Sequence, residues 1–177
     1  MVKSKYGELT KMAWVRLETK TLSSPAENVV FDSVITSPKK FNEIISHYIG
    51  AGNANYDLQL GYSSIDTGSN YAYRQNINGG SDSTITSHVD IRLQDAATAG
   101  GDNCFSVVYL LNIASQEKMA ITFSLGTGDA SGAGTAPVRQ EVTGKWVNTS
   151  NQQDLAKVRT SFPDLTIGSN ITQIGTD

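Results

Sequence analysis

Apolar and polar residues alternate along several short stretches of the chain, and turn-forming residues separate these stretches. From Ile85 to Leu93 the large apolar side chains share one parity. Tyr56 to Tyr62 and Met119 to Leu125 repeat this period of two. Because successive side chains of a strand point to opposite faces of a sheet, each stretch predicts a strand with one buried face and one solvent-exposed face. In the third stretch, the pattern assigns the large residues from Met119 to Leu125 to the core.

A further stretch, Phe105 to Ile113, is apolar on both parities and rich in β-branched and aromatic residues. This composition predicts a central strand that is covered on both faces. Weaker strand-like runs lie at Trp14 to Leu22, Val29 to Phe31, Val138 to Trp146 and Leu165 to Ile174. Together these runs predict an all-β protein, an antiparallel β-sandwich of jelly-roll type with roughly eight to ten strands.

One segment is open to a second interpretation. Ser37 and Pro38 resemble the start of a helix, and Phe41, Ile44 and Tyr48 have helical spacing. At most one short helix, near residues 38–48, is therefore compatible with the sequence. The neighbouring runs are strands, however, and the segment also alternates, so we favour a turn over residues 37–40 followed by a strand.

The chain has 177 residues, the length of one domain that can bury a substantial core without disulfides or metals. We expect an N-terminal arm over residues 1–12 and a single β-sandwich domain over residues 13–177. Several lysines and arginines lie near the N-terminus, and we interpret the arm as solvated, with docking on a neighbouring subunit as the alternative. Cys104 opens the most apolar run, which predicts a buried, unreactive thiol.

Net charge and hydropathy argue against two classes of partner. Lys and Arg number 14 against 17 Asp and Glu, a net charge of -3, so we expect no nucleic-acid partner. No apolar run has the length of a membrane span, and none follows the first residues as a signal peptide would. We therefore expect no membrane insertion and synthesis in a cytoplasm.

No convincing catalytic or metal-binding constellation is present in the sequence. The only histidines are His47 and His88, and His88 with Asp90 predicts an ordinary surface pair because no nucleophile motif accompanies them. Asp66 and Asn70 could offer oxygen ligands, but a turn built by Asx and Gly residues explains that loop more simply. We expect no enzymatic activity, no cofactor and no metal.

Two pairs of aromatic residues are candidates for contacts with partners. Tyr71 and Tyr73 follow the loop that begins at Asp66, and exposed rings there could stack on sugars, although burial at the start of a strand is the favoured interpretation. Trp14 and Trp146 lie in strand-like runs and are candidates for core residues or subunit-interface anchors.

In the order and spacing of several segments, the chain resembles β-sandwich structural proteins of tailed bacteriophages, of the head-decoration and tail-fibre type. The segments are Trp14 to Pro25, Val29 to Phe31, Tyr56 to Tyr62 with Gly68 to Tyr73, Gly144 to Trp146, Ile167 to Ile171, and Ile174 with Gly175. The resemblance spans nearly the whole chain and is weakest from Ser37 to Tyr48. Such domains commonly form homotrimers, carry no cofactor and pack against capsid or tail subunits.

The resemblance implies a non-enzymatic virion protein that is exposed on the particle, as a head decoration (cement) protein or as a tail-fibre component. Its partners would be copies of itself and other virion proteins. The alternative hypothesis is a carbohydrate-binding or host-receptor-binding module that recognises a host surface glycan through Tyr71 and Tyr73.

Overall fold

The computed structural model describes residues 13–31, 37–49, 54–95, 103–127, 132–161 and 164–177, and these residues contain strands and no helix. The arm predicted over residues 1–12 lies outside this part of the chain. The thirteen strands are β1 (Val15–Thr21), β2 (Asn28–Phe31), β3 (Phe41–Tyr48), β4 (Tyr56–Tyr62), β5 (Ser64–Ile65), β6 (Tyr71–Ile77), β7 (Ser83–His88), β8 (Ile91–Gln94), β9 (Cys104–Leu111), β10 (Lys118–Gly126), β11 (Val138–Trp146), β12 (Leu155–Thr160) and β13 (Asn170–Thr176).

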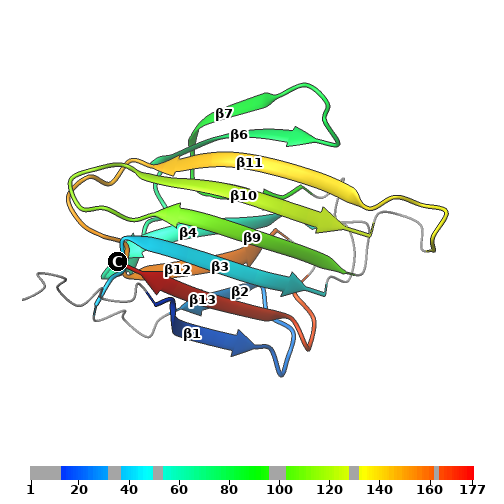
Figure 1. Cartoon of the computed structure of the whole chain (residues 1–177), viewed down its shortest axis with the longest axis horizontal. Helices are drawn as coiled ribbons and strands as arrows, with labels where there is room; N and C mark the ends of the chain where they lie inside the picture. Colours follow the sequence, from blue (N-terminus) through cyan, green and yellow to red (C-terminus); the bar gives the residue numbers. More distant parts are fainter. Residues whose placement is uncertain (1–12, 32–36, 50–53, 96–102, 128–131, 162–163) are drawn as a thin grey trace, which may run out of the picture.

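Two antiparallel sheets face each other (Figure 1). The large sheet has eight strands in the order β1-β13-β3-β9-β10-β11-β6-β7, and the small sheet contains β2, β12, β4, β5 and β8. The chain alternates between the sheets through its first four strands, and the last two strands return to fill the gaps, β12 between β2 and β4 and β13 between β1 and β3. The all-β prediction is therefore confirmed, with more strands than the eight to ten expected.

The boundaries of several strands agree with the alternation in the sequence. The strands β4 and β11 begin and end at the predicted residues, and β3 follows a bend at residues 37–40 as favoured. The helical spacing near residues 38–48 therefore does not produce a helix. The residues with helical spacing lie in β3, which pairs with β13 on one side and with β9 on the other. These pairings satisfy the backbone hydrogen-bonding groups that a helix would satisfy internally.

The predicted single strand from Ile85 to Leu93 is instead two strands that belong to different sheets. Strand β7 is at the edge of the large sheet, whereas β8 pairs with β4 in the small sheet. The chain changes direction at Ser87, whose φ of 54° lies in the left-handed region, and at the bend that follows. Alternation continues across the bend, so the pattern of residues cannot reveal the change of sheet.

Large aromatic side chains fill part of the space between the sheets. Tyr48 and Tyr56 stack with their ring centroids 4.6 Å apart, and Tyr71 lies beside Trp146 at 6.3 Å. Small polar residues occupy several inward positions of β9 and β10, where the Ser106 hydroxyl donates to that of Tyr48 and the Ser124 hydroxyl donates to the carbonyl oxygen of Leu93. These hydrogen bonds compensate for the burial of the two serines.

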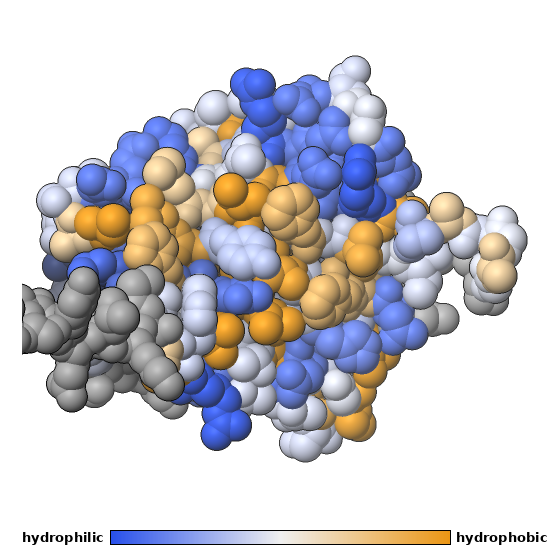
Figure 2. Space-filling view, in the orientation of Figure 1, coloured by the Kyte–Doolittle hydropathy of each residue, from blue (hydrophilic) through white to orange (hydrophobic). Residues whose placement is uncertain are grey.

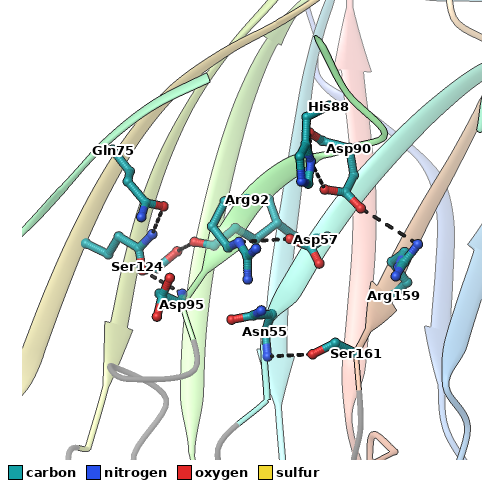
Figure 3. A network of polar contacts seen from close by, with 12 residues as sticks. Asn55, Asp57, Gln75, His88, Asp90, Arg92, Asp95, Ser124, Arg159 and Ser161 are labelled. Atoms are coloured by element: carbon teal, nitrogen blue, oxygen red, sulfur yellow. Dashed lines mark hydrogen bonds and ion pairs between the residues drawn. The ribbon is translucent and has the colours of Figure 1, made fainter. Parts of the chain in front are cut away.

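The polar residues of β4 are buried, contrary to the predicted solvent-exposed face. Asp57 and Gln59 are 3% and 1% exposed. Asp57 lies 3.0 Å from the Nε of Arg92, and Asp90 lies 2.8 Å from the Nδ1 of His88 and 3.7 Å from Arg159. Figure 3 shows these groups converging from β4, β8, β12 and the β7–β8 bend. The alternation at β4 therefore separates an apolar face from a buried ionic face.

Gly61 is the position where two backbone segments approach most closely, because β5 turns directly onto β4. An added Cβ would lie 2.2 Å from the carbonyl oxygen of Ser64. We expect Gly61→Ala to lower the free energy of unfolding by roughly 1–3 kcal/mol, since backbone must move to relieve the clash. Urea unfolding measures this, with Gly134→Ala as control because nothing lies within 4 Å of its added Cβ. Equal midpoints for the two variants would contradict the expectation.

Candidate functional site

The outer face of the large sheet carries a band of exposed apolar side chains across β3, β9 and β10. Figure 2 shows this band across the middle of the face that the large sheet turns to the viewer in Figure 1. Its seven large members are between 42% and 53% exposed: Phe41, Phe105, Tyr109, Met119, Ile121, Phe123 and Leu125. We call this set, together with the partly exposed Ile45, Val107 and Leu111, the apolar band.

The strand pairing arranges the apolar band in four rows of three positions. From one end the rows are Phe41–Leu111–Met119, Glu43–Tyr109–Ile121, Ile45–Val107–Phe123 and His47–Phe105–Leu125. Only Glu43 and His47, both on β3, interrupt the apolar character of the rows. Because neighbours across strands lie about 5 Å apart, the side chains form one continuous surface.

Strand β10 is oriented opposite to its predicted orientation. The large residues Met119, Ile121 and Phe123, which the pattern assigned to the core, point outward at 48–53% exposed. Ala120, Thr122 and Ser124, on the polar parity, are buried between the sheets at 2% or less. The alternation correctly distinguishes two faces, and the inner one takes the small residues because large side chains from other strands already fill that space.

Strand β9 is central in the large sheet, as predicted, but it is covered on one face only. Cys104, Ser106, Val108 and Leu110 point inward and are buried, whereas Phe105 and Tyr109 are nearly half exposed. Strands that are apolar on both faces normally have a layer packed on each side. Within the part of the chain that is described, the second layer is missing at β9.

The apolar band opens at one end into a hollow of about 890 Å³. Its floor is formed by β9 and β10 residues such as Tyr109, Met119 and Ile121, and one margin is formed by Trp14 and Phe41. The opposite margin includes Arg74 on β6 and neighbouring residues of β7. The hollow is a shallow depression of the sheet surface that is mostly apolar inside and polar at the β6–β7 margin.

Charged side chains border the apolar band on its β11 side. Going outward along the first, second and fourth rows, the next residue on β11 is Lys145 beside Met119, Thr143 beside Ile121, and Arg139 beside Leu125. Arg139 lies 3.5 Å from Glu141, and Lys145 lies 2.8 Å from Glu117 at the surface. An apolar centre with a charged and polar rim is the usual composition of a protein–protein interface.

The apolar band is at the upper end of the apolar patch sizes that monomeric proteins expose. Seven half-exposed side chains of this size present on the order of 600 Å² of apolar area. Monomeric soluble proteins rarely expose contiguous patches larger than this, and stable interfaces bury about 800 Å² on each partner. The apolar band with its rim is therefore large enough for a stable protein–protein contact.

Both candidate glycan contacts are in the core. Tyr71 is 1% exposed and Tyr73 5% exposed, so neither ring presents a face to a sugar, and the favoured interpretation of burial is the correct one. The Tyr71 hydroxyl donates to the carbonyl oxygen of Leu60 at 2.9 Å and accepts from the Leu60 amide at the same distance. Burial raises the pKa of both phenols, which keeps them neutral.

The two tryptophans differ in their positions. Trp146 is 1% exposed, and its indole nitrogen donates to the Asp66 carboxylate at 2.7 Å, so it is a core residue and not an interface anchor. Trp14 is 48% exposed and lines the hollow beside Phe41. Of the predicted interface candidates, only Trp14 therefore lies where a partner could reach it.

The groups considered for catalysis lie in separate ion pairs and hydrogen bonds. His88 and Asp90 form a pair, but Asp90 is 1% exposed and also faces Arg159, so this is not the surface pair that the sequence predicted. His47 bonds to Asn103 and lies on the outer face of the large sheet, beside Phe105. Cys104 is a buried thiol, and burial raises its pKa to about 11, so it stays protonated at neutral pH. The prediction that Cys104 is buried is confirmed.

The loop from Asp66 to Asn70 is held by its own hydrogen bonds, as the turn interpretation predicted. The Asp66 carboxylate accepts hydrogen bonds from the Gly68 amide at 2.8 Å, from the Asn70 side chain at 2.9 Å and from the Trp146 indole. Burial alone would raise the pKa of Asp66, but these donors together lower it below its usual value. Among the described residues, no group of three or more histidine, cysteine or acidic side chains is arranged to hold a metal ion.

Sequence reasoning missed the apolar band as a site, although one indication was present. The run from Phe105 to Ile113 is apolar on both parities, which requires a cover on each face. A single two-layer sandwich provides only one cover for a strand. The layer on the other face would have to come from outside the sandwich. A run that is apolar on both parities could therefore have indicated an interface.

Comparisons with known proteins identify no relative of this chain. Searches of protein-family models, of curated proteins and of solved structures find no match for this chain. In the described ranges, no helix is long and apolar enough to cross a membrane. The candidate functional site is therefore defined by geometry alone, as an apolar band with a hollow at one end and a charged rim.

Proposed function

We propose that this chain is a non-enzymatic structural protein of a bacteriophage virion, exposed on the particle as a head decoration (cement) protein or a tail-fibre component. The observation that carries the proposal is the apolar band, an interface-sized surface without a cover in the described chain. A protein with such a surface is suited to permanent assembly, because an exposed patch of this size favours association with other subunits. The resemblance to phage β-sandwich proteins supplies the kind of assembly.

The proposed partners are other copies of the chain, as a homotrimer, and neighbouring capsid or tail subunits. Virion proteins must stay attached when the free protein is very dilute, and repeated symmetric contacts achieve this better than one isolated contact. We propose synthesis in the host cytoplasm and residence in the virion, with no role for nucleic acid, membrane insertion or a cofactor.

We also assign the sandwich to the jelly-roll type. The interleaving of β12 between β2 and β4, and of β13 between β1 and β3, supports this assignment, because jelly rolls fold a long antiparallel pair across two sheets. Each sheet has one outer face, and among the described residues the apolar band lies across the centre of the outer face of the large sheet.

The glycan-binding hypothesis has less support than the structural one. Its two named contacts, Tyr71 and Tyr73, are buried, and most of the exposed aromatic rings among the described residues lie in the apolar band, with Trp14 and Tyr62 outside it. Sugar-binding surfaces combine one or two rings with several hydrogen-bonding groups, whereas rows of aliphatic side chains such as Met119, Ile121 and Leu125 offer none.

An antibody against the purified chain tests the proposed function. We expect immunogold to label intact particles of the phage that encodes the chain, either over the head surface or along the tail fibres. The position of the gold distinguishes a decoration protein from a fibre component. Antibody that has been absorbed with the purified chain is the control. If the protein is present in infected cells but missing from purified particles, the virion proposal is wrong.

A further inference from the structure

We infer that residues 83–90, which we call the β7 segment, form a movable wall of the hollow that is held against the small sheet by buried polar contacts and is released as the pH rises. The segment comprises β7 and the bend that follows it. The inference rests on the proposed function in one respect only, that the apolar band and its hollow serve assembly, and it names a regulation of that site.

The β7 segment forms one margin of the hollow. Thr84, Ile85 and Thr86 line the hollow at the margin opposite Trp14 and Phe41. An outward movement of the segment therefore widens the hollow and changes the surface that a partner subunit meets. A contact that controls the position of the segment also controls access to the hollow.

Strand β7 has few contacts of its own that hold it in place. Among the described residues it is an edge strand that pairs with β6 alone, and the register of this pairing shifts between Tyr71 and Tyr73. Four of its six residues are exposed, and its apolar residue, Ile85, packs against the core but is only partly buried. Segments with few buried contacts open locally at a lower free-energy cost than the core does.

The end of the β7 segment is held by polar contacts to the small sheet. Asp90 is 1% exposed, and its carboxylate lies 2.8 Å from the Nδ1 of His88 and 3.7 Å from Arg159 on β12. The Gln59 side chain on β4 donates to the carbonyl oxygen of Val89 at 3.0 Å. The bend therefore lies against the polar face of β4 and closes that face off from water.

Asp57 makes this attachment sensitive to pH. It lies on the same face of β4 as Gln59, two residues away, and it is 3% exposed close to Asp90 (Figure 3). Burial raises the pKa of Asp57 to about 7, against the effect of Arg92. When the bend lifts, water reaches the carboxyl group and its pKa returns toward the ordinary value of 3.8. The attached segment therefore holds the proton more tightly, and detachment becomes easier as the pH rises from about 4 to about 7.

The charged groups around Asp57 come from every element packed against it. Arg92 on β8 lies 3.0 Å from its carboxylate, and Arg159, Asp90 and His88 act on it from β12, the bend and β7. The groups that act on this cluster from further away are Tyr73 on β6, Asp95 after β8, Lys157 on β12 and Glu27 before β2. Two arginines face two aspartates, so the cost of ionising Asp57 comes chiefly from burial of the charge and less from the like charge of Asp90.

Hydrogen–deuterium exchange of the full chain, followed by mass spectrometry, tests this movement. Exchange is measured at about pH 5 and about pH 7, and is corrected for the intrinsic pH dependence of amide exchange. Peptides from β10, at the centre of the large sheet, report on opening of the whole chain, and peptides from β1 report on the other edge of the sheet. Asp57→Asn, which cannot ionise, is compared with Glu141→Gln, which removes a surface carboxylate on the outer face. Circular dichroism verifies that both variants fold.

We expect the amides of β7 to be less protected than those of β10 at both pH values, as local opening requires. Their protection should fall by at least about tenfold between pH 5 and pH 7. The protection of β1 should change less, because opening of β1 leaves Asp57 buried. Asp57→Asn should lose the fall at β7, and Glu141→Gln should keep it.

Protection of β7 as strong as that of β10 would mean that the segment opens only together with the whole chain, which overturns the inference. It is also overturned if the protection of β7 does not fall with pH, or falls equally in Asp57→Asn. Exchange is measured on the free chain, whereas immunogold locates the chain on particles. The movement and the proposed function therefore fail separately.

Discussion

Ile121→Asp combined with Phe123→Asp is expected to convert the assembled protein into folded monomers. Both side chains point outward from the middle of the apolar band and are 48% exposed, so their removal leaves the core between the sheets intact. In the assembly, each new carboxylate would be transferred from water into an apolar contact, which costs several kcal/mol. Because 1.4 kcal/mol corresponds to a factor of ten, we expect association to weaken by at least about 1,000-fold.

Native mass spectrometry at low micromolar concentration measures this change, and circular dichroism verifies that the variant remains folded. Ile167→Asp is the matched control, since Ile167 is 60% exposed but lies in the turn before β13, outside the band. The control should keep the mass of the unmodified assembly. An unchanged mass for the double variant would show that assembly does not depend on the apolar band.

The fold class was predictable because alternation reports strands directly. At β4 and β11, turn residues also lie next to the alternating residues, so even the boundaries agree with the pattern. The β7–β8 segment was not predictable in the same way. There, the alternation continues while the chain moves from one sheet to the other, and only the left-handed φ of Ser87 marks the change.

The orientation of a strand is harder to predict than its existence. At β10, alternation separates Met119 and Ile121 from Ala120 and Thr122, but it does not say which set points inward. The usual assumption is that large apolar residues form the core. It fails here because rings from other strands, including those of Tyr48 and Tyr56, occupy the space between the sheets.

The candidate site was partly predictable for the same reason. Trp14 was a candidate interface residue and lies at the hollow, whereas Tyr71, Tyr73 and Trp146 are in the core. Exposed and buried aromatic residues cannot be distinguished from the residue type alone. The apolar band also depends on the register of three strands that are far apart in the sequence, and register comes from the folded structure.

The pH dependence of stability is expected to depend strongly on Asp57. Burial raises the pKa of Asp57 to about 7, with Arg92 and Arg159 acting in the opposite direction, His88 lowering it less and Asp90 adding to the increase. A carboxyl whose pKa is higher in the folded state binds a proton more tightly there than in the unfolded chain. Its contribution to stability is therefore complete below about pH 4 and is lost as the pH rises to about 7.

We expect this group to lower the free energy of unfolding by up to about 4 kcal/mol between pH 4 and pH 7, or about 1.4 kcal/mol for each pH unit. The Asp57→Asn variant cannot ionise at this position and should lack the decrease. Urea unfolding at several pH values across this range, compared between the two proteins, isolates the contribution. Glu141→Gln removes a surface carboxylate on the outer face and should retain the decrease. If the unmodified chain instead gains stability relative to Asp57→Asn as the pH rises, the ion pair with Arg92 outweighs the cost of burial, and Asp57 is ionised in the folded protein.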